Sequence, residues 1–395
     1  MLRLRNRLPA LLRVASPLPA PIHPRPCCIL STSTSPAPFS VEDYLVASCG
    51  LAPAQACEVS KKLSRELLST GSRRPLDELS YSRLNSASNP DAIIALLAGA
   101  GLSRADIAAV VSADPLLLRA YAKKIAPRLL GLRDRVGLSP PQIVRFLLVG
   151  PHVRTRSGVV PKLEFFISFY GSFEQVLVVL RRNSRLLSAS IERSVKPNIA
   201  LLRHRGVRDI AQLCSKVPRL LNFNPERVKE FLLRAEQLGV PPTSGLFKYA
   251  VYVVVCISKE KVAAKLEFLK RTLGCSKSEV STAVSKMPVI LGLSEKNLLR
   301  KIEFLVNEAA MEPWTIVEKP VLLTYSLEKR LVPRHYVMKI LQEKGLLNSN
   351  MSLSSLGYTG EEIFKSKFID SHMDSVPGLA DAYAAARAGI VPSRV

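Results

Sequence analysis

Basic residues recur at a fixed distance before a repeated short segment that is expected to end a helix. We call this segment a stop, and Pro-Arg-Leu-Leu at 218–221 is typical of it. Arg182, Lys216 and Lys286 each lie two positions before the first residue of such a stop. Further basic residues beside these stops are Arg181, Arg185 and Arg219. One cation at the same point of each unit would form a ladder that matches the negative charges of a phosphate backbone. A local alternative stays open, because a cation at a helix C-terminus also interacts favourably with the helix dipole.

Arg154 and Arg156 flank another stop, which begins at Pro151, at a place where the repeat expects apolar packing. One hypothesis is that both side chains reach a phosphate or a base edge. The alternative is that the preceding helix ends a turn earlier and that both side chains are solvated.

Residues for catalysis or metal binding are not grouped in this sequence. It contains no G-x-x-x-x-G-K-[ST], G-x-S-x-G or H-E-x-x-H motif. The seven cysteines form no C-x-x-C pair and the five histidines are scattered. We therefore predict no enzyme, no metal, no cofactor and no small-molecule substrate. Cys214 and Cys256 lie in apolar helical stretches and are predicted to be buried thiols.

The elements that position the basic residues repeat with a period of 32 to 36 residues. The seven stops begin at Pro115, Pro151, Ser184, Pro218, Tyr252, Pro288 and Pro320. Glycine keeps the same period at 137, 171, 206, 239, 274 and 345, and lapses at Ala309-Ala310. An apolar cluster such as 228–232 opens each first helix. Three markers in one register indicate a repeat array.

Each unit follows one plan of helix, glycine turn, helix, proline stop and short apolar turn. Asn89 is predicted to cap the first helix, with Pro90 at its first position, and Ser103 with Asp106 resembles a capping pair. The run 249–255 has β-branched and aromatic residues typical of a strand. The register places 244–252 on a second helix, and we follow the register. The sequence thus predicts an all-α solenoid of about seven units of about 34 residues.

Composition and charge bound the rest of the chain. Apolar residues make up 47% of it, and no apolar run approaches the roughly 20 residues of a membrane span. The formal charge is +24, and five arginines before residue 42 account for five charges, which leaves +19. Such an excess favours a polyanionic partner, usually nucleic acid.

Four segments are predicted from these patterns. Residues 1–40 are rich in Arg, Pro and Ser and lack acids, as in an organellar transit peptide, and the arginines favour a mitochondrion over a chloroplast. Residues 41–88 form an N-terminal helical cap and 89–346 the array. Residues 347–395 form a C-terminal cap and tail, with the tail from residue 380 expected to fray.

The proline stop, the Pro-Lys-Leu-Glu-Phe-Phe and Lys-Leu-Glu-Phe-Leu helix starts at 161–166 and 265–269, and the glycine turn together resemble the mitochondrial transcription termination factor (mTERF) family. The likeness covers about 90–346, and 361–368 is similar to that family's C-terminal end. The resemblance implies a left-handed superhelix whose units each have two α-helices and a short 3-10 turn. It also implies nucleic-acid binding along a basic groove. The chain departs from the pattern at Arg154, Ser184 and Tyr252, which puts the regularity of the groove in doubt there.

Some members of the family bind double-stranded DNA in organelles and affect transcription, while plant members are more often tied to RNA metabolism such as intron splicing. The long Pro- and Ser-rich leader is similar to the plant type. We therefore expect an organellar nucleic-acid-binding protein that binds as a monomer. The alternative is a helical-repeat scaffold that binds a protein partner, and the basic excess argues against it.

Overall fold

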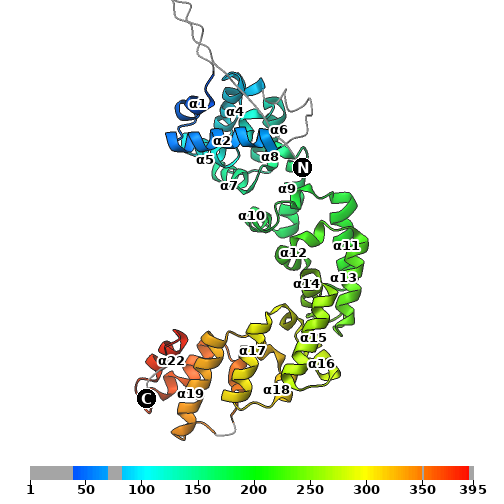
Figure 1. Ribbon diagram of the computed structural model, residues 1–395, viewed down its shortest axis with the longest axis vertical. Coiled ribbons are helices and arrows are strands. Elements are labelled where there is room, and N and C mark those ends of the chain that lie inside the picture. The colour runs from blue at the N-terminus through cyan, green and yellow to red at the C-terminus, as the bar shows by residue number, and fades with distance from the viewer. Residues whose placement is uncertain (1–38, 70–81, 349–350, 391–395) are drawn as a thin grey trace, which may run out of the picture. The chain divides into compact units, whose positions relative to one another are not determined.

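The computed structural model describes residues 39–69, 82–348 and 351–390. Within these ranges the regular structure is helical and no residue lies in a β-strand, so the predicted all-α fold is confirmed. Figure 1 shows the helices in colour order, each beside the elements that precede and follow it in the chain. Apart from its last two residues, the predicted transit peptide at 1–40 lies outside the described residues.

The first helix of each unit buries an apolar stripe. In one of them, Val228, Phe231 and Leu232 are buried at positions i, i+3 and i+4, the spacing of one helix face. The first helices are α4 (Ser88–Gly99), α6 (Ala122–Asp134), α9 (Val159–Tyr170), α11 (Lys196–His204), α13 (Pro225–Gln237), α15 (Lys259–Leu273), α17 (Glu295–Glu303) and α19 (Val332–Glu343).

The second helices run back along the first ones. The predicted capping pair is confirmed, because Ser103 and Asp106 form a complete capping box at the start of one of them. The second helices are α5 (Arg104–Ala113), α7 (Pro140–Val149), α10 (Phe173–Arg182), α12 (Ile210–Lys216), α14 (Phe247–Cys256), α16 (Lys277–Lys286) and α18 (Pro313–Glu318).

The turn between the two helices requires a left-handed residue. Gly171 ends α9 with φ 90° and Gly274 ends α15 with φ 65°, a conformation in which a Cβ is strained. Where the glycine lapses, Ala310 takes the same role with φ 47°. The backbone of this unit therefore keeps the geometry of the others without their glycine.

The stops are mostly 3-10 turns, because proline lacks the N–H that would continue the helix. Their paired leucines, such as Leu220 and Leu221, are fully buried. The turns are η2 (Pro115–Arg119), η3 (Leu186–Ser188), η5 (Pro218–Leu221), η6 (Pro288–Gly292) and η8 (Pro320–Thr324).

Two stops depart from the expected 3-10 turn. After Pro151 the chain forms a short α-helix, α8 (His152–Thr155). The slot at Tyr252 lies inside α14, so the expected turn is absent there. No proline interrupts this segment, and its valines continue the helix because Val253 and Val254 are buried against neighbouring elements.

The run 249–255 is thus helical and not a strand. The register predicted the helix up to residue 252 and wrongly placed a turn there. The prediction of two buried thiols in this region is half wrong, since Cys214 is buried and Cys256, the last residue of α14, is exposed.

Three π-helical turns extend the first helices: η4 (Ile191–Val195), η7 (Phe304–Glu308) and η9 (Leu327–Leu331). Two of them directly precede α11 and α19, which carry Pro197 and Pro333 as their second residues. A proline there cannot donate the usual hydrogen bond, and the backbone adapts with wider π turns.

Further helices pack at the two ends of the array. They are α1 (Val41–Ala47), α2 (Pro53–Ser69) and η1 (Ser82–Leu84) at one end, and α20 (Leu353–Tyr358), α21 (Glu361–Phe368), η10 (Asp370–His372) and α22 (Leu379–Arg387) at the other. The tail is expected from the sequence to fray from residue 380. Up to Arg387 this expectation is wrong, because Leu379, Tyr383 and Ala386 of α22 are buried. One core of buried residues runs from Val253 to Tyr383, so each unit is stabilised by its neighbours.

Candidate nucleic-acid interface

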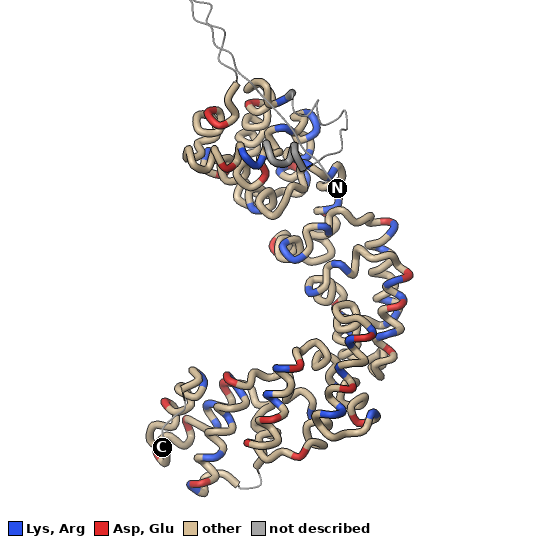
Figure 2. Tube along the Cα trace, viewed as in Figure 1, with Lys and Arg blue, Asp and Glu red and all other residues tan. Residues whose placement is uncertain are grey.

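The repeated plan brings helix ends and turns together along one edge of the array, which we call the turn edge. It consists of the last turns of the second helices, the stop turns, and the first turns of the following first helices. Neighbouring stop turns contact each other along it, as η3 contacts η5 and η6 contacts η8. All eight predicted site residues lie on this edge. Figure 2 shows basic and acidic positions interspersed along the array.

Arg181, Arg182 and Arg185 lie together where α10 meets η3, and all three are exposed. Arg182 donates a hydrogen bond of 2.7 Å from Nη1 to the carbonyl oxygen of Ser215, near the end of α12. The carbonyl oxygen of Arg185 accepts one of 3.0 Å from Nδ2 of Asn222. Arg182 is therefore held against the next unit, while the side chains of Arg181 and Arg185 extend into solvent.

Lys216 and Arg219 flank the next stop, and both are exposed. The ammonium of Lys216 lies 5.5 Å from the centroid of the Tyr249 ring, a cation–π geometry. Arg219 donates from Nη2 to the carbonyl oxygen of Val255 at 2.5 Å. Both cations therefore contact the second helix of the following unit, α14.

Lys286 repeats this relationship further along, because its Nζ lies 3.3 Å from the carbonyl oxygen of Glu318 at the end of α18. Arg182, Arg219 and Lys286 thus each bind a carbonyl oxygen one unit ahead. These carbonyl oxygens lie in the last turns of helices, where no helical N–H is available to them. The basic residues therefore join neighbouring units, a third role beside phosphate binding and the helix dipole.

Arg154 and Arg156 are more enclosed than the other predicted residues. Nε of Arg154 lies 3.0 Å and 3.2 Å from the two carboxylate oxygens of Asp114, and the two side chains are only 25% and 15% exposed. Nε of Arg156 is buried without a hydrogen-bond partner. Burial, and secondly the charge of Arg156, lower the pKa of His152 to about 4. Arg154 is therefore neither apolar packing nor a freely solvated cation.

Sequence reasoning missed a second set of polar residues, which bind the stop turns from inside. Side-chain donors on the first helices bond carbonyl oxygens 22 to 31 residues ahead, at or next to a chain turn. These donors are Asn89, Arg128, Lys162, Asn198, Arg234, Lys265, Lys301 and Arg334. We call them the inner donors.

Asn89 belongs to the inner donors and is not a cap, since α4 begins one residue earlier with Ala87 as its N-cap. The amide of Asn198 is fully buried and bonds Leu220, Leu221 and Phe223. Burial lowers the pKa values of Lys162 and Lys301. A polar residue recurring in an apolar stripe was the signal for them. The lysines and arginines among the inner donors contribute to the basic excess, but their side chains are already hydrogen-bonded within the fold.

Outside the turn edge, we find one groove and no group of residues suited to a metal in the described part of the chain. An open groove of about 690 Å³ lies between α9, α11 and α12, lined by Phe165, Phe169, Lys196, Arg203 and Asp209 among others. None of the predicted site residues lines it. In the described part of the chain, no three His, Cys, Asp or Glu residues are grouped so that they could hold a metal.

The described residues contain no single helix long and apolar enough to cross a membrane. Together, α9 and α10 reach that length and composition, but they are bent by 105°.

Comparisons with known proteins agree with this architecture. The family model mTERF matches residues 91–365, well over half of the chain. The Arabidopsis thaliana protein "Transcription termination factor MTERF8, chloroplastic" is 25% identical over 206 residues, which is 51% of this chain and 40% of that protein. The match thus spans less than half of the relative. The seven helix pairs, their proline stops and the family match lead to one conclusion: the chain belongs to the mTERF family.

Proposed function

We propose that this protein binds organellar nucleic acid through its turn edge and acts in organelle gene expression, without an enzymatic activity of its own. The observation that carries the proposal is the gathering of exposed cations along that edge, at and beside the ends of α10, α12 and α16, in a chain whose charge outside the leader is +19. A phosphate backbone presents negative charge at regular intervals, so a row of cations can bind many phosphates at once.

The predicted residues contribute to this surface in different ways. Arg181 and Arg185 have free guanidinium groups and can bind phosphates directly. Arg182, Lys216, Arg219 and Lys286 are tethered by one contact each and can offer their remaining donors. The side chains of Arg154 and Arg156 are more buried, and we propose that they hold the local turn in place and add positive electrostatic potential there. We propose that one protein chain binds one nucleic-acid segment.

The role in gene expression is either in transcription, such as its termination, or in RNA metabolism, such as intron splicing. The named relative is a transcription termination factor, which supports the first. The leader supports an organelle. Its arginines favour a mitochondrion, whereas the relative is described as chloroplastic. A reporter fused to residues 1–60 should be imported into one of these organelles, and a cytosolic reporter would contradict the proposal.

Binding is tested with the full chain without residues 1–40, by fluorescence anisotropy with labelled duplex DNA and labelled single-stranded RNA. Each titration is repeated from 50 to 300 mM salt. We expect saturable binding whose log affinity falls linearly with log salt, with a slope of roughly −0.9 per phosphate contact on duplex DNA or −0.7 on a single strand. No binding to either nucleic acid, together with capture of an acidic protein, would favour a scaffold instead.

A further inference from the structure

A second set of cations lies on the turn edge, at the starts of the first helices. Four of these starts read Ser or Asn, any residue, Glu, then Arg or Lys, at 190–193, 224–227, 258–261 and 326–329. Their cations follow the same period as the stops, and α6 and α17 each have a lysine at the corresponding turn. The helix-start cations are Lys124, Arg193, Arg227, Lys261, Lys296 and Lys329, and all are exposed.

Helix stability does not account for these cations. The N-terminal end of a helix carries partial positive charge, so a cation in its first turn is unfavourable. Three second helices have Asp106, Gln142 or Glu279 at the third position, where each side chain completes a capping box. At the four first-helix starts quoted above, the acid stands one position earlier and the third position holds a cation.

Three of the acids beside the helix-start cations bind other cations. Glu192 binds Lys196 at 2.6 Å, and Glu226 binds Lys229 at 2.8 Å. Glu328 binds Arg300 of the preceding unit at 2.9 Å. Within the described part of the chain, no carboxylate pairs with a helix-start cation. Each of these units therefore keeps one net positive charge at its start.

The backbone N–H groups at these helix starts are partly satisfied from within. The hydroxyl oxygens of Ser190, Ser258 and Ser326 each accept a hydrogen bond from the backbone N–H of the third helical residue. The helix ends are thus capped, and the feature open to a ligand is the row of side chains. Arg227 is also oriented, because its guanidinium carbon lies 5.2 Å and 5.6 Å from the ring centroids of Phe223 and Phe231.

The spacing of the row suits a phosphate backbone. First helices of neighbouring units contact each other, as α11 contacts α13 and α15 contacts α17. Packed helices lie about 8–10 Å apart. Phosphates of one strand follow each other every 3.4 Å along a duplex axis, so a contacting pair of helices would place one cation at about every third phosphate.

We propose that the helix-start cations are the main phosphate-binding row of this protein, and that the tethered Arg182, Arg219 and Lys286 contribute mostly by holding the units in register. This inference rests on the proposed function and names the residues that carry it. The ligand group is the phosphodiester, which DNA and RNA share, and the two labelled probes described above distinguish them.

The test compares two triple variants of the same three helices in the leaderless chain. One is Arg193→Gln, Lys261→Gln and Lys329→Gln, at the starts of the helices that contain α11, α15 and α19. The matched control is Arg203→Gln, Arg271→Gln and Lys344→Gln, at their far ends. The control residues are also exposed, and both variants lose three charges. Affinity is measured against salt for both nucleic acids, and the melting temperature is measured beside it.

The helix-start variant should reduce the magnitude of the salt slope by roughly 2 to 3 and weaken binding about 100-fold at 0.1 M salt. Its melting temperature should stay the same or rise, because unfavourable dipole interactions are removed. The control should keep the slope, and its melting temperature should stay the same or fall. Equal slope changes in both variants, or no change in the first, would overturn the inference. If the unchanged chain binds neither probe, the proposed function fails and the inference with it.

Discussion

Lys301 of α17 donates a hydrogen bond of 2.8 Å from its Nζ to the carbonyl oxygen of Leu323 in η8, although the lysine is only 5% exposed. A 3-10 turn leaves carbonyl groups without a helical partner, and a buried carbonyl without a partner is costly. The inner donors answer this need in unit after unit. Where a unit has a stop turn, that turn and the first helix are therefore joined by a polar bond.

Replacing Lys301 with Met should test this relationship. Met fills a similar volume but cannot donate, so the Leu323 carbonyl would lose its partner. We expect a loss of about 1–3 kcal/mol in the free energy of unfolding, measured by urea denaturation. The control Lys344→Met removes an exposed lysine and should change stability by less than about 0.5 kcal/mol. Equal stability of both variants would show that water or a neighbouring group replaces the lysine.

The tethered cations should prove to be stabilising residues. Replacing Arg182, Lys216 and Lys286 together with Gln removes two inter-unit hydrogen bonds and one cation–π contact. We expect a loss of about 1–4 kcal/mol in the free energy of unfolding, from these contacts and from the helix dipole. The salt slope of binding should change less than in the helix-start variant. An unchanged stability with a slope reduced by two or more would instead assign these residues chiefly to phosphate binding.

The fold could be predicted from the sequence where one residue type dictates the backbone. After the second helices, a proline begins each turn at Pro115, Pro218, Pro288 and Pro320, where its missing N–H ends the preceding helix. Where the proline is missing, the register alone predicted a turn at Tyr252, and burial of the following valines continued α14 instead. Ala310 takes its positive φ from the surrounding chain and not from its own preference.

The candidate site could be predicted only as a set of positions. The sequence shows that Arg182 and Lys286 stand beside stops. It cannot show that their partners are the carbonyl oxygens of Ser215 and Glu318, since every residue has a carbonyl group. The inner donors were missed for the related reason that a lysine such as Lys301 reads as solvated until its neighbours are known.

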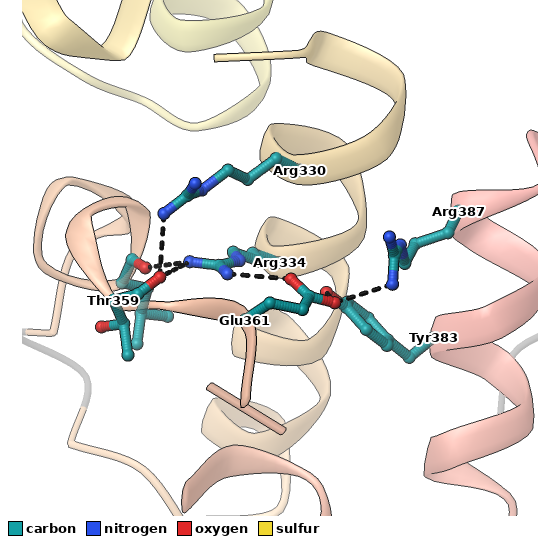
Figure 3. Close-up of polar contacts among 7 residues, drawn as sticks. Arg330, Arg334, Thr359, Glu361, Tyr383 and Arg387 are labelled. Atoms are coloured by element: carbon teal, nitrogen blue, oxygen red, sulfur yellow. Dashed lines mark hydrogen bonds and ion pairs between the residues drawn. The ribbon is translucent and has the colours of Figure 1, made fainter. Parts of the chain in front are cut away.

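The docking of the C-terminal helix depends on Glu361. Its carboxylate accepts hydrogen bonds from Arg334 (3.0 Å), Tyr383 (3.0 Å) and Arg387 (2.7 Å). Figure 3 shows these side chains converging on it. Arg334 is fully buried and also bonds the carbonyl oxygen of Thr359. Burial alone would raise the pKa of Glu361, but the hydrogen bonds and the two arginine charges outweigh it and lower the pKa. The carboxylate thus joins α19, α21 and α22.

Glu361→Gln should therefore loosen α22. It leaves the buried charge of Arg334 without its counter-ion, and we expect a loss of about 3 kcal/mol, the low end for a broken buried pair because Glu361 is 31% exposed. Hydrogen exchange should accelerate most in α22. The control Arg387→Gln removes only the more exposed partner and should cost about 0–1 kcal/mol. Uniform exchange in both variants would contradict a role of Glu361 in docking this helix.

His152 should make the stability of the array depend on pH between 6.5 and 4. The imidazole is 3% exposed, its Nε2 has no hydrogen-bond partner, and its ring lies 5.7 Å from that of Phe146. Burial, with the nearby charge of Arg156, lowers its pKa from 6.5 to about 4. Between these values the unfolded chain binds a proton that the folded chain does not.

Stability must therefore fall as the pH is lowered through this window, by up to about 3 kcal/mol from His152. Burial and the charge of Lys339 also lower the pKa of His335, so this residue adds to the fall in the same direction. His152→Leu keeps an apolar side chain against Phe146 and removes the titration. Urea denaturation at pH 7 and pH 4.5 should show a smaller loss of unfolding free energy in the variant than in the unchanged protein. The same loss in both proteins would mean that His152 is protonated in the folded chain and finds a partner for its charge.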